Sequence, residues 1–212
     1  MGEERIFFNS GGLKIEGLLE KLSGDKGVVV THPHPLYGGT MHNAVVKSIV
    51  RVYRDENYTT LRFNFRGVER SEGEYDNGIG EQEDVRSALK TLADLGVMWI
   101  DLAGYSFGAW VNAVGLRTFE KVGRMIMVSP PVGLLDFDGL NADARVRLVI
   151  TGGKDEIAPA TLVEERVPKW NSGATFRIIP DADHFYGGKT DAIEEIVHEF
   201  LATKGPDKIK GL

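Results

Sequence analysis

Residues 102–110 read LAGYSFGAW, and the interpretation of the whole chain starts from this stretch. Ser106 stands between Gly104 and Gly108, directly after an apolar run and directly before a segment with helical spacing. A serine with a glycine two positions to each side is a short pattern and weak evidence by itself. Where such a serine joins a buried strand to a helix, the glycines allow a sharp turn that exposes the hydroxyl oxygen. The neighbouring segments therefore decide what Ser106 does.

Apolar stretches with strand character alternate along the chain with segments of helical periodicity. GVVV at 27–30 is a continuous apolar run, which is typical of a strand buried on both faces. Strands are expected at 5–8, 13–19, 27–30, 59–65, 97–103, 124–129, 145–151 and 175–180, and helices at 41–55, 81–95, 107–118, 159–170 and 190–203. The first two strands, separated by NSGG, read as a hairpin. Alternating strands and helices predict an α/β fold, a mostly parallel sheet with helices on both faces.

Length and composition are those of an ordinary globular chain. The 212 residues are 42% hydrophobic and 26% charged, which predicts a single domain over 1–212, with 204–212 as a flexible tail. The net charge of -6 argues against a nucleic-acid surface, which needs a basic face. The chain has no cysteine, which excludes disulfides, thiolate catalysis and cysteine-based metal sites.

The sequence gives no sign of export or membrane insertion. The start, MGEERIFFNS, is charged, and no apolar run approaches the length of a membrane span. We therefore expect a soluble, cytoplasmic protein that needs no cofactor; a homodimer is compatible with the sequence. No glycine-rich phosphate-binding motif follows the first parallel strand, which disfavours a nucleotide-binding domain.

Three chemically reactive side chains follow predicted parallel strands, where α/β sheets bind their ligands. Ser106 lies in GYSFG, Asp155 in GGKDEIAP and His184 in DADHFYGG. A serine hydroxyl is a poor nucleophile unless a base lies within hydrogen-bond reach, and a carboxylate holds that base in the correct tautomer. We therefore predict Ser106 as nucleophile, His184 as base and Asp155 as the orienting acid.

Asp155 has competitors for the third position, but it is the best placed. A carboxylate close to His184 in sequence is badly placed to reach the far side of its ring, whereas Asp155 follows a strand directly. The competing carboxylates are Glu156, Asp136, Asp138, Asp181 and Asp183.

Two backbone N–H groups are expected to stabilise a developing oxyanion. Phe107, the residue after the serine, supplies one. In the loop HPHPLYGG the prolines have no N–H, which leaves His34, Leu36 or Tyr37 for the second, and Leu36 is the favoured candidate.

Four residues are candidates for the substrate pocket: His34, Tyr37, Arg66 and Tyr186. Arg66 would favour an anionic substrate, although a salt bridge to a neighbouring glutamate is an equally good reading. His32 and His34 have H-x-H spacing. With no cysteine and no carboxylate partner we predict no metal site and expect these histidines to form structural hydrogen bonds.

The order of elements, together with GYSFG, GGKDEIAP and DHFYGG, resembles the α/β-hydrolase family. HPHPLYGGTMHN and RFNFRGVERSEGEYD resemble motifs of its small lidless branch, similar to dienelactone hydrolase, and the likeness covers nearly the whole chain. It implies a three-layer fold, an eight-stranded sheet whose second strand is antiparallel, no substantial lid, and a triad of Ser106, His184 and Asp155.

The chain departs from that branch in three places. Dienelactone hydrolases proper use a cysteine nucleophile, which this chain lacks, so their substrate is not carried over. Glu69 stands where the branch usually has glycine and adds a charge near the predicted mouth. The segment between the strands at 124–129 and 145–151 is short and irregular, which predicts an open site.

These patterns predict a serine hydrolase that cleaves a small carboxylic ester or thioester through an acyl-enzyme. Acyl transfer to another acceptor and peptide cleavage use the same triad and stay open. A hydrolase-like module that binds a small molecule or a partner without catalysis is the alternative from a different class. Such a module would be expected to have lost a member of the triad.

Overall fold

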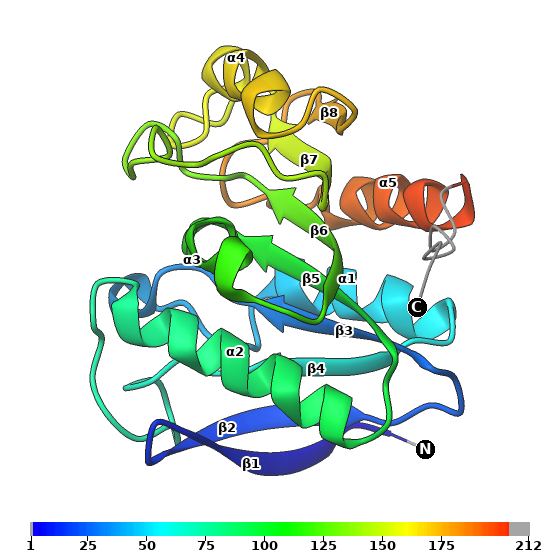
Figure 1. The fold of residues 1–212 in the computed structure, drawn as a ribbon. Coiled ribbons are helices and arrows are strands. Elements are labelled where there is room, and N and C mark those ends of the chain that lie inside the picture. Colours follow the sequence, from blue (N-terminus) through cyan, green and yellow to red (C-terminus); the bar gives the residue numbers. More distant parts are fainter. Residues whose placement is uncertain (1, 204–212) are drawn as a thin grey trace.

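The computed structural model describes residues 2–203, so the tail predicted at 204–212 lies outside the described residues. Its eight strands form one sheet in the order β1-β2-β4-β3-β5-β6-β7-β8 (Figure 1). The strands are β1 (Glu4–Ser10), β2 (Leu13–Glu20), β3 (Lys26–Thr31), β4 (Thr59–Phe63), β5 (Trp99–Tyr105), β6 (Val122–Val128), β7 (Val146–Gly152) and β8 (Thr175–Ile179). The helices are α1 (Ala44–Asp55), α2 (Ile79–Asp94), α3 (Phe107–Gly115), α4 (Ala160–Trp170) and α5 (Thr190–Thr203).

The sheet is parallel except at β2, as the family resemblance implies. The β1–β2 hairpin pairs antiparallel from Glu4↔Leu19 to Ser10↔Leu13, and β2 also runs antiparallel to β4. In the rest of the sheet, from β4 through β3 to β8, every pair of adjacent strands is parallel. The carboxyl ends of these parallel strands therefore meet at one edge of the sheet, where the loops after β3, β5, β6, β7 and β8 gather.

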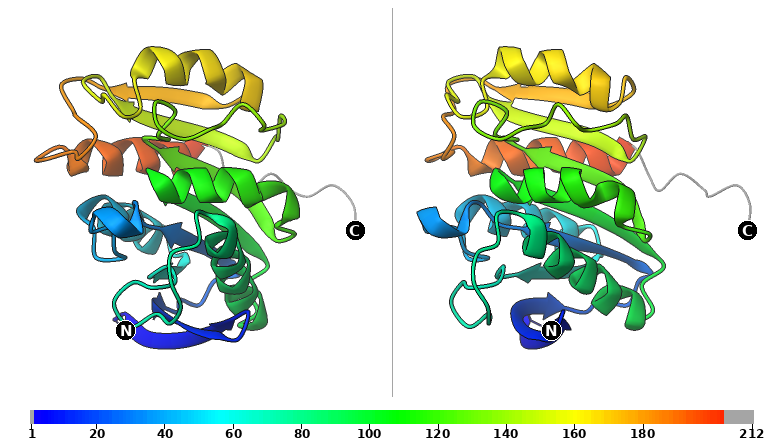
Figure 2. Two further views of the ribbon diagram at one scale, coloured as in Figure 1. Left: turned by 90° about the vertical axis from the view of Figure 1, so that its left-hand side faces the viewer. Right: turned by 60° about the vertical axis from the view of Figure 1, so that its left-hand side comes forward.

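Helices cover both faces of the sheet and make three layers (Figures 1 and 2). The apolar stripes of α2, α3 and α4 pack on one face, and those of α1 and α5 pack on the other. Val28, Val29 and Val30 of β3 are all fully buried but divide between the two cores, because successive side chains of a strand point to opposite faces. The continuous run GVVV is thus explained by burial on both sides.

Every predicted strand and helix is present, with small differences at the ends. Helix α1 begins at Ala44 rather than at residue 41, because the Asn43 side chain accepts a hydrogen bond from the Val45 N–H at 2.9 Å and caps the first turn. A short 3₁₀ helix, η1 (Pro35–Tyr37), was not predicted. The connection from β6 to β7 is described throughout and contains no helix, in agreement with the predicted short, irregular segment.

A buried ion pair ties β5 to β6 below the site. Arg124 donates to Asp101 at 2.6 Å, and the two side chains are 2% and 0% exposed. Tyr53 and Trp99 also donate to the Asp101 carboxylate, at 3.0 and 2.8 Å, so its oxygens are well satisfied. The pair helps to fix the relative position of two central strands. Ser106 directly follows β5 and Ser129 directly follows β6, at the same edge of the sheet.

Candidate active site

Ser106 lies on a strained turn between β5 and α3. Its φ of 54° is in the left-handed region, which is rare for a residue with a side chain. A Cβ added at Gly104 would lie 2.7 Å from the Ala109 nitrogen, and one at Gly108 would lie 2.7 Å from the His32 carbonyl oxygen. Both glycines are therefore required by close backbone approach, and together they explain the spacing that the sequence showed around Ser106.

The three side chains predicted to act together are in contact. Ser106 Oγ lies 2.8 Å from His184 Nε2, and His184 Nδ1 lies 2.9 Å from Asp155 Oδ2 and 3.0 Å from Oδ1. All three residues are buried, at 7%, 7% and 4% exposure. Because a carboxylate only accepts, His184 Nδ1 carries the proton toward Asp155, which leaves Nε2 free to accept from the Ser106 hydroxyl.

Asp155 accepts hydrogen bonds from three further residues besides His184. Its Oδ1 accepts from the N–H groups of Ile157 and Ala158 at 2.9 and 2.7 Å, and its Oδ2 accepts from Ser129 Oγ at 2.6 Å. Burial opposes ionisation of this carboxyl, but the hydrogen bonds from His184, Ser129 and Ala158 outweigh it and lower its pKa. Asp155 is therefore an anion that faces the imidazole.

Ser129 is a part of the site that the sequence analysis missed. It is fully buried at the end of β6, with a φ of 45°, and its Oγ also lies 2.6 Å from Tyr186 Oη. A serine at the end of a predicted strand was the available signal, but nothing in the sequence set it apart from other serines.

The His184 loop is anchored from both sides. Tyr105 Oη donates to the His184 carbonyl at 2.6 Å, and Asp183 Oδ1 accepts from the N–H groups of Phe185 and Tyr186. Burial raises the pKa of Tyr105, so its hydroxyl stays protonated and keeps donating. The imidazole is thus presented to Ser106 by a loop with its own internal hydrogen bonds.

Leu36, the expected second oxyanion donor, already has a hydrogen-bond acceptor in the structure. The Leu36 N–H donates to His34 Nδ1 at 3.2 Å, and the Tyr37 N–H donates to the His34 carbonyl at 3.1 Å. Within residues 2–203, the backbone N–H groups of His34 and Phe107 have no acceptor. Phe107 keeps its predicted place at the first turn of α3, and His34 replaces Leu36 as the candidate from the β3 loop.

His32 holds that loop in place, as the structural reading of the histidines expected. Its Nδ1 lies 2.6 Å from the Pro33 carbonyl oxygen, and its Nε2 accepts from the Phe65 N–H at 3.0 Å. Burial lowers the pKa of His32 to about 4, so the ring is neutral at pH 7. The carbonyl that it binds belongs to the same peptide group as the His34 N–H.

Ser106 lines a cavity of about 720 Å³. Its walls are formed by Pro33, His34, Tyr37, Gly38, Gly39, Asn43, Tyr105, Ser106, Phe107, Pro131, Leu134, Leu135, Ile157, His184 and Phe185. Two predicted pocket residues, His34 and Tyr37, lie among these lining residues. A cavity of this size accommodates a small to medium organic molecule.

Arg66 and Tyr186 do not line the cavity, which corrects both predictions. The Arg66 guanidinium pairs with the buried Asp84 at 2.9 Å. The sequence had suggested a salt bridge to a neighbouring glutamate of the same loop instead. The Tyr186 hydroxyl points to Ser129, and the residue is 1% exposed. Glu69 is also outside the lining; its carboxylate accepts from Asn64 Nδ2 at 2.8 Å.

A Ser–His–Asp chain at the carboxyl edge of a mostly parallel, helix-covered sheet is the arrangement that defines the α/β serine hydrolases as a class. No family model matches the chain. The uncharacterized protein RP471 of Rickettsia prowazekii (strain Madrid E) is 33% identical over 211 residues, which cover 94% of this chain and 89% of the relative.

Two solved structures are similar over almost their whole length. An alpha-beta serine hydrolase homologue from Coxiella burnetii is 34% identical, covers 95% of this chain and 98% of its own, and superposes with a TM-score of 0.87. XC6422 from Xanthomonas campestris, a serine hydrolase without lid, is 29% identical over 95% of this chain and 94% of its own, also with a TM-score of 0.87.

The chain therefore belongs to the α/β-hydrolase family, in its small lidless branch. These neighbours support a hydrolase that acts on a small molecule. Among residues 2–203, no helix has both the length and the apolar character needed to cross a membrane.

Proposed function

We propose that the protein is a serine hydrolase that cleaves a small carboxylic ester or thioester through an acyl-enzyme. The observation that carries this proposal is the continuous hydrogen-bond chain from Ser106 through His184 to Asp155, at 2.8 and 2.9 Å. Ser106 and His184 line the 720 Å³ cavity. Each member sits on a different loop of the same sheet edge, so only the folded chain assembles them.

In the first half of the reaction, Ser106 Oγ attacks the carbonyl carbon while its proton passes to His184 Nε2. The carbonyl π electrons move onto the oxygen, and the N–H groups of Phe107 and His34 donate to the resulting oxyanion. The anionic Asp155 stabilises the imidazolium that forms. When the tetrahedral intermediate collapses, the bond to the leaving group breaks and the leaving group takes the proton from Nε2.

In the second half, water repeats the attack on the acyl-enzyme. His184 Nε2 takes a proton from the water, whose oxygen bonds to the acyl carbon. Collapse of the second intermediate breaks the bond to Ser106 Oγ, which regains its proton from the imidazolium. The products are a carboxylic acid and an alcohol or thiol.

Other acceptors and other roles use the same residues. An alcohol or amine in place of water would make the protein an acyltransferase, and an amide substrate would make it a peptidase. A binding module without catalysis would have no need for the four hydrogen bonds that orient the Asp155 carboxylate and favour its ionised form. The cytoplasmic location, the homodimer and the absence of nucleic-acid binding remain predictions from sequence.

The test is covalent labelling with a fluorophosphonate followed by intact-mass spectrometry. The proposal expects one adduct on the native chain and none on Ser106→Ala, with Ser23→Ala, an exposed serine outside the cavity, labelled as the native chain. Folding of each variant is checked by circular dichroism. An unlabelled native chain that hydrolyses no ester would overturn the proposal in favour of the binding module.

A further inference from the structure

The walls of the Ser106 cavity contain no formally charged residue among those described: no aspartate, glutamate, lysine or arginine lines them. Beyond the reacting Ser106 and His184, the polar side chains are only His34, Tyr37, Asn43 and Tyr105. Burial lowers the pKa of His34, so this ring is neutral at pH 7. A substrate in the cavity therefore meets no fixed positive charge.

Arg66, the cation that the sequence suggested for an anionic substrate, is engaged elsewhere. Its guanidinium makes two hydrogen bonds to Asp84, at 2.9 and 3.1 Å, and Asp84 is fully buried. Moving Arg66 to the cavity would leave the Asp84 carboxylate buried without its charged partner, which is costly. Arg66 is therefore held away from the substrate.

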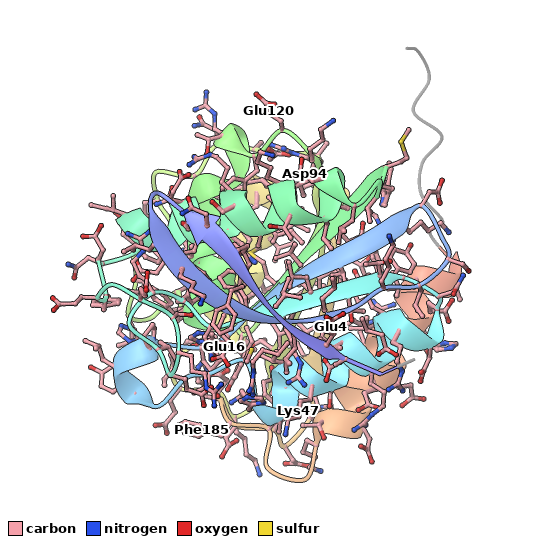
Figure 3. All side chains as sticks on the ribbon, turned by 90° about the horizontal axis from the view of Figure 1, so that it is seen from below. Glu4, Glu16, Lys47, Asp94, Glu120 and Phe185 are labelled. Carbon is pink, nitrogen blue, oxygen red and sulfur yellow. The ribbon has the colours of Figure 1, made fainter. Side chains whose placement is uncertain are left out.

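The opening is instead bordered by large exposed apolar side chains. Tyr37 is 86% exposed, Leu134 71% and Phe185 73%, and all three line the cavity. They come from three loops, after β3, β6 and β8, and Figure 3 shows Phe185 at the periphery of the molecule. Single exposed apolar residues are common, but three around one opening form an apolar contact surface for a ligand.

The other apolar side chains of the lining are less exposed: Pro131 is buried, and Leu135 and Ile157 are half-buried. Asn43 adds one polar group: its Oδ1 accepts from the Val45 N–H, and within residues 2–203 its Nδ2 donates to no other group. One polar substituent on an otherwise apolar substrate could therefore be satisfied there.

We propose that the substrate is an uncharged ester that carries an apolar chain or aromatic ring of several carbons, and that the cavity discriminates against acyl groups ending in a carboxylate. The proposal rests on the hydrolase function proposed above. Its physical basis is that an apolar group gains free energy when it leaves water for these walls, whereas a carboxylate would lose hydration with no cation to replace it.

The first test is a series of p-nitrophenyl esters with the native protein. From acetate to hexanoate, kcat/KM is expected to rise about three- to fourfold for each methylene that enters the cavity. Mono-p-nitrophenyl glutarate, in which a carboxylate ends a chain of similar length, is expected to be cleaved at least about 30-fold less efficiently than the hexanoate. Equal or better cleavage of the glutarate would overturn the proposal.

The second test adds a cation to the mouth. Leu134→Arg is expected to raise the ratio of glutarate to hexanoate cleavage about threefold, because an exposed charge pair is worth little more than that. Met98→Arg is the matched control: it is similarly exposed, at 78% against 71%, but lies before β5, at the opposite edge of the sheet. The same ratio change in both variants would mean that net charge, not the cavity wall, sets the preference, and would overturn the proposal.

Fluorophosphonate labelling separates the two proposals. If Ser106 is labelled and the acetate is cleaved, but longer apolar chains give no gain, the substrate class is wrong and the hydrolase function stands. If the native chain is neither labelled nor active on any ester of the series, the hydrolase function fails and this inference fails with it.

Discussion

Ser129 Oγ donates a hydrogen bond to Asp155 Oδ2 at 2.6 Å, and both side chains are buried. Because a carboxylate only accepts, the second contact of Ser129, with Tyr186 Oη at 2.6 Å, must run from the tyrosine to the serine. Burial raises the pKa of Tyr186, which keeps that phenol protonated. A chain of hydrogen bonds from Tyr186 through Ser129 thus ends on the carboxylate that faces His184.

Removal of the Ser129 hydroxyl should weaken catalysis without removing any group that touches substrate. In Ser129→Ala, one donor that lowers the Asp155 pKa is lost, so this pKa rises and kcat/KM falls about tenfold, as for the loss of one charge-assisted hydrogen bond. The acid limb of the pH–rate profile should move to higher pH. The measurement is kcat/KM against pH on a p-nitrophenyl ester.

A second variant separates the hydroxyl from backbone strain. Ser129→Gly also lacks the hydroxyl, but glycine adopts the φ of 45° without strain. Equal loss of activity in both variants, with the glycine variant more stable to urea, would assign the effect to the hydroxyl. Native activity and an unchanged pH profile in Ser129→Gly would show that Ser129 has only a structural role.

Gly39→Ala should disturb the proposed oxyanion donor from a distance. An added Cβ would lie 2.1 Å from the Pro33 carbonyl oxygen, which belongs to the peptide group that carries the His34 N–H. That peptide must shift, and kcat is expected to fall about 100-fold, the usual cost of one misplaced oxyanion donor. Steady-state kinetics measure the loss.

Gly187→Ala, where an added Cβ meets nothing within 4 Å, is the control and should keep native kinetics. Retention of native kcat in Gly39→Ala would contradict the assignment of His34.

Removal of one partner from the buried pair of Arg124 and Asp101 should cost far more stability than removal of a partner from an exposed pair. Arg124→Met leaves the Asp101 carboxylate buried without its cation and is expected to lower the free energy of unfolding by about 3–5 kcal/mol in urea denaturation. Lys90→Met, which breaks an exposed pair with Asp94, is expected to cost about 0.5 kcal/mol or less. Similar losses in both variants would mean that burial of the first pair adds nothing.

Stability should decrease as the pH falls, with His32 as an identifiable contributor. Burial lowers the pKa of His32 to about 4 in the folded chain, whereas an unfolded histidine titrates near 6.5. The unfolded state therefore takes up the proton first, and the stability present above pH 6.5 is lost as the pH falls toward 4. The loss from this group is roughly 3 kcal/mol.

The measurement is urea denaturation between pH 7 and pH 4. His32→Asn is expected to be less stable at pH 7, because the Phe65 N–H loses its acceptor, but to show a shallower pH dependence. His198→Asn, which removes an exposed histidine, is the control for the loss of one histidine. A native slope in His32→Asn would assign the pH dependence to other groups.

Much of the site could be predicted because parallel strands bring sequence-distant positions together by a simple rule. Ser106, Asp155 and His184 each follow a strand, and the carboxyl ends of parallel strands share one edge, so their proximity follows from the strand pattern alone. Gly104 and Gly108 marked the turn through their spacing. The eight strands and five helices followed from periodicity in the same way.

Other features depended on which donors and acceptors the packed chain leaves unpaired. Leu36 and His34 offer equivalent backbone N–H groups in the sequence, and only the folded loop shows that the His34 side chain accepts from Leu36. Arg66 had glutamates close by in sequence, yet it pairs with Asp84 on α2. Local sequence does not reveal such pairings, because they depend on distances between separate elements.

The sequence by itself determined the order of strands and helices, the sheet edge at which the loops meet, and the three side chains that meet there. Those properties follow from hydrophobic periodicity and strand direction, which are local. The tertiary structure alone decided that Ser129 supports Asp155, that His34 rather than Leu36 has a free N–H, and that the cavity walls are uncharged. These depend on hydrogen bonds and burial, which exist only once distant segments are packed within a few ångströms of one another.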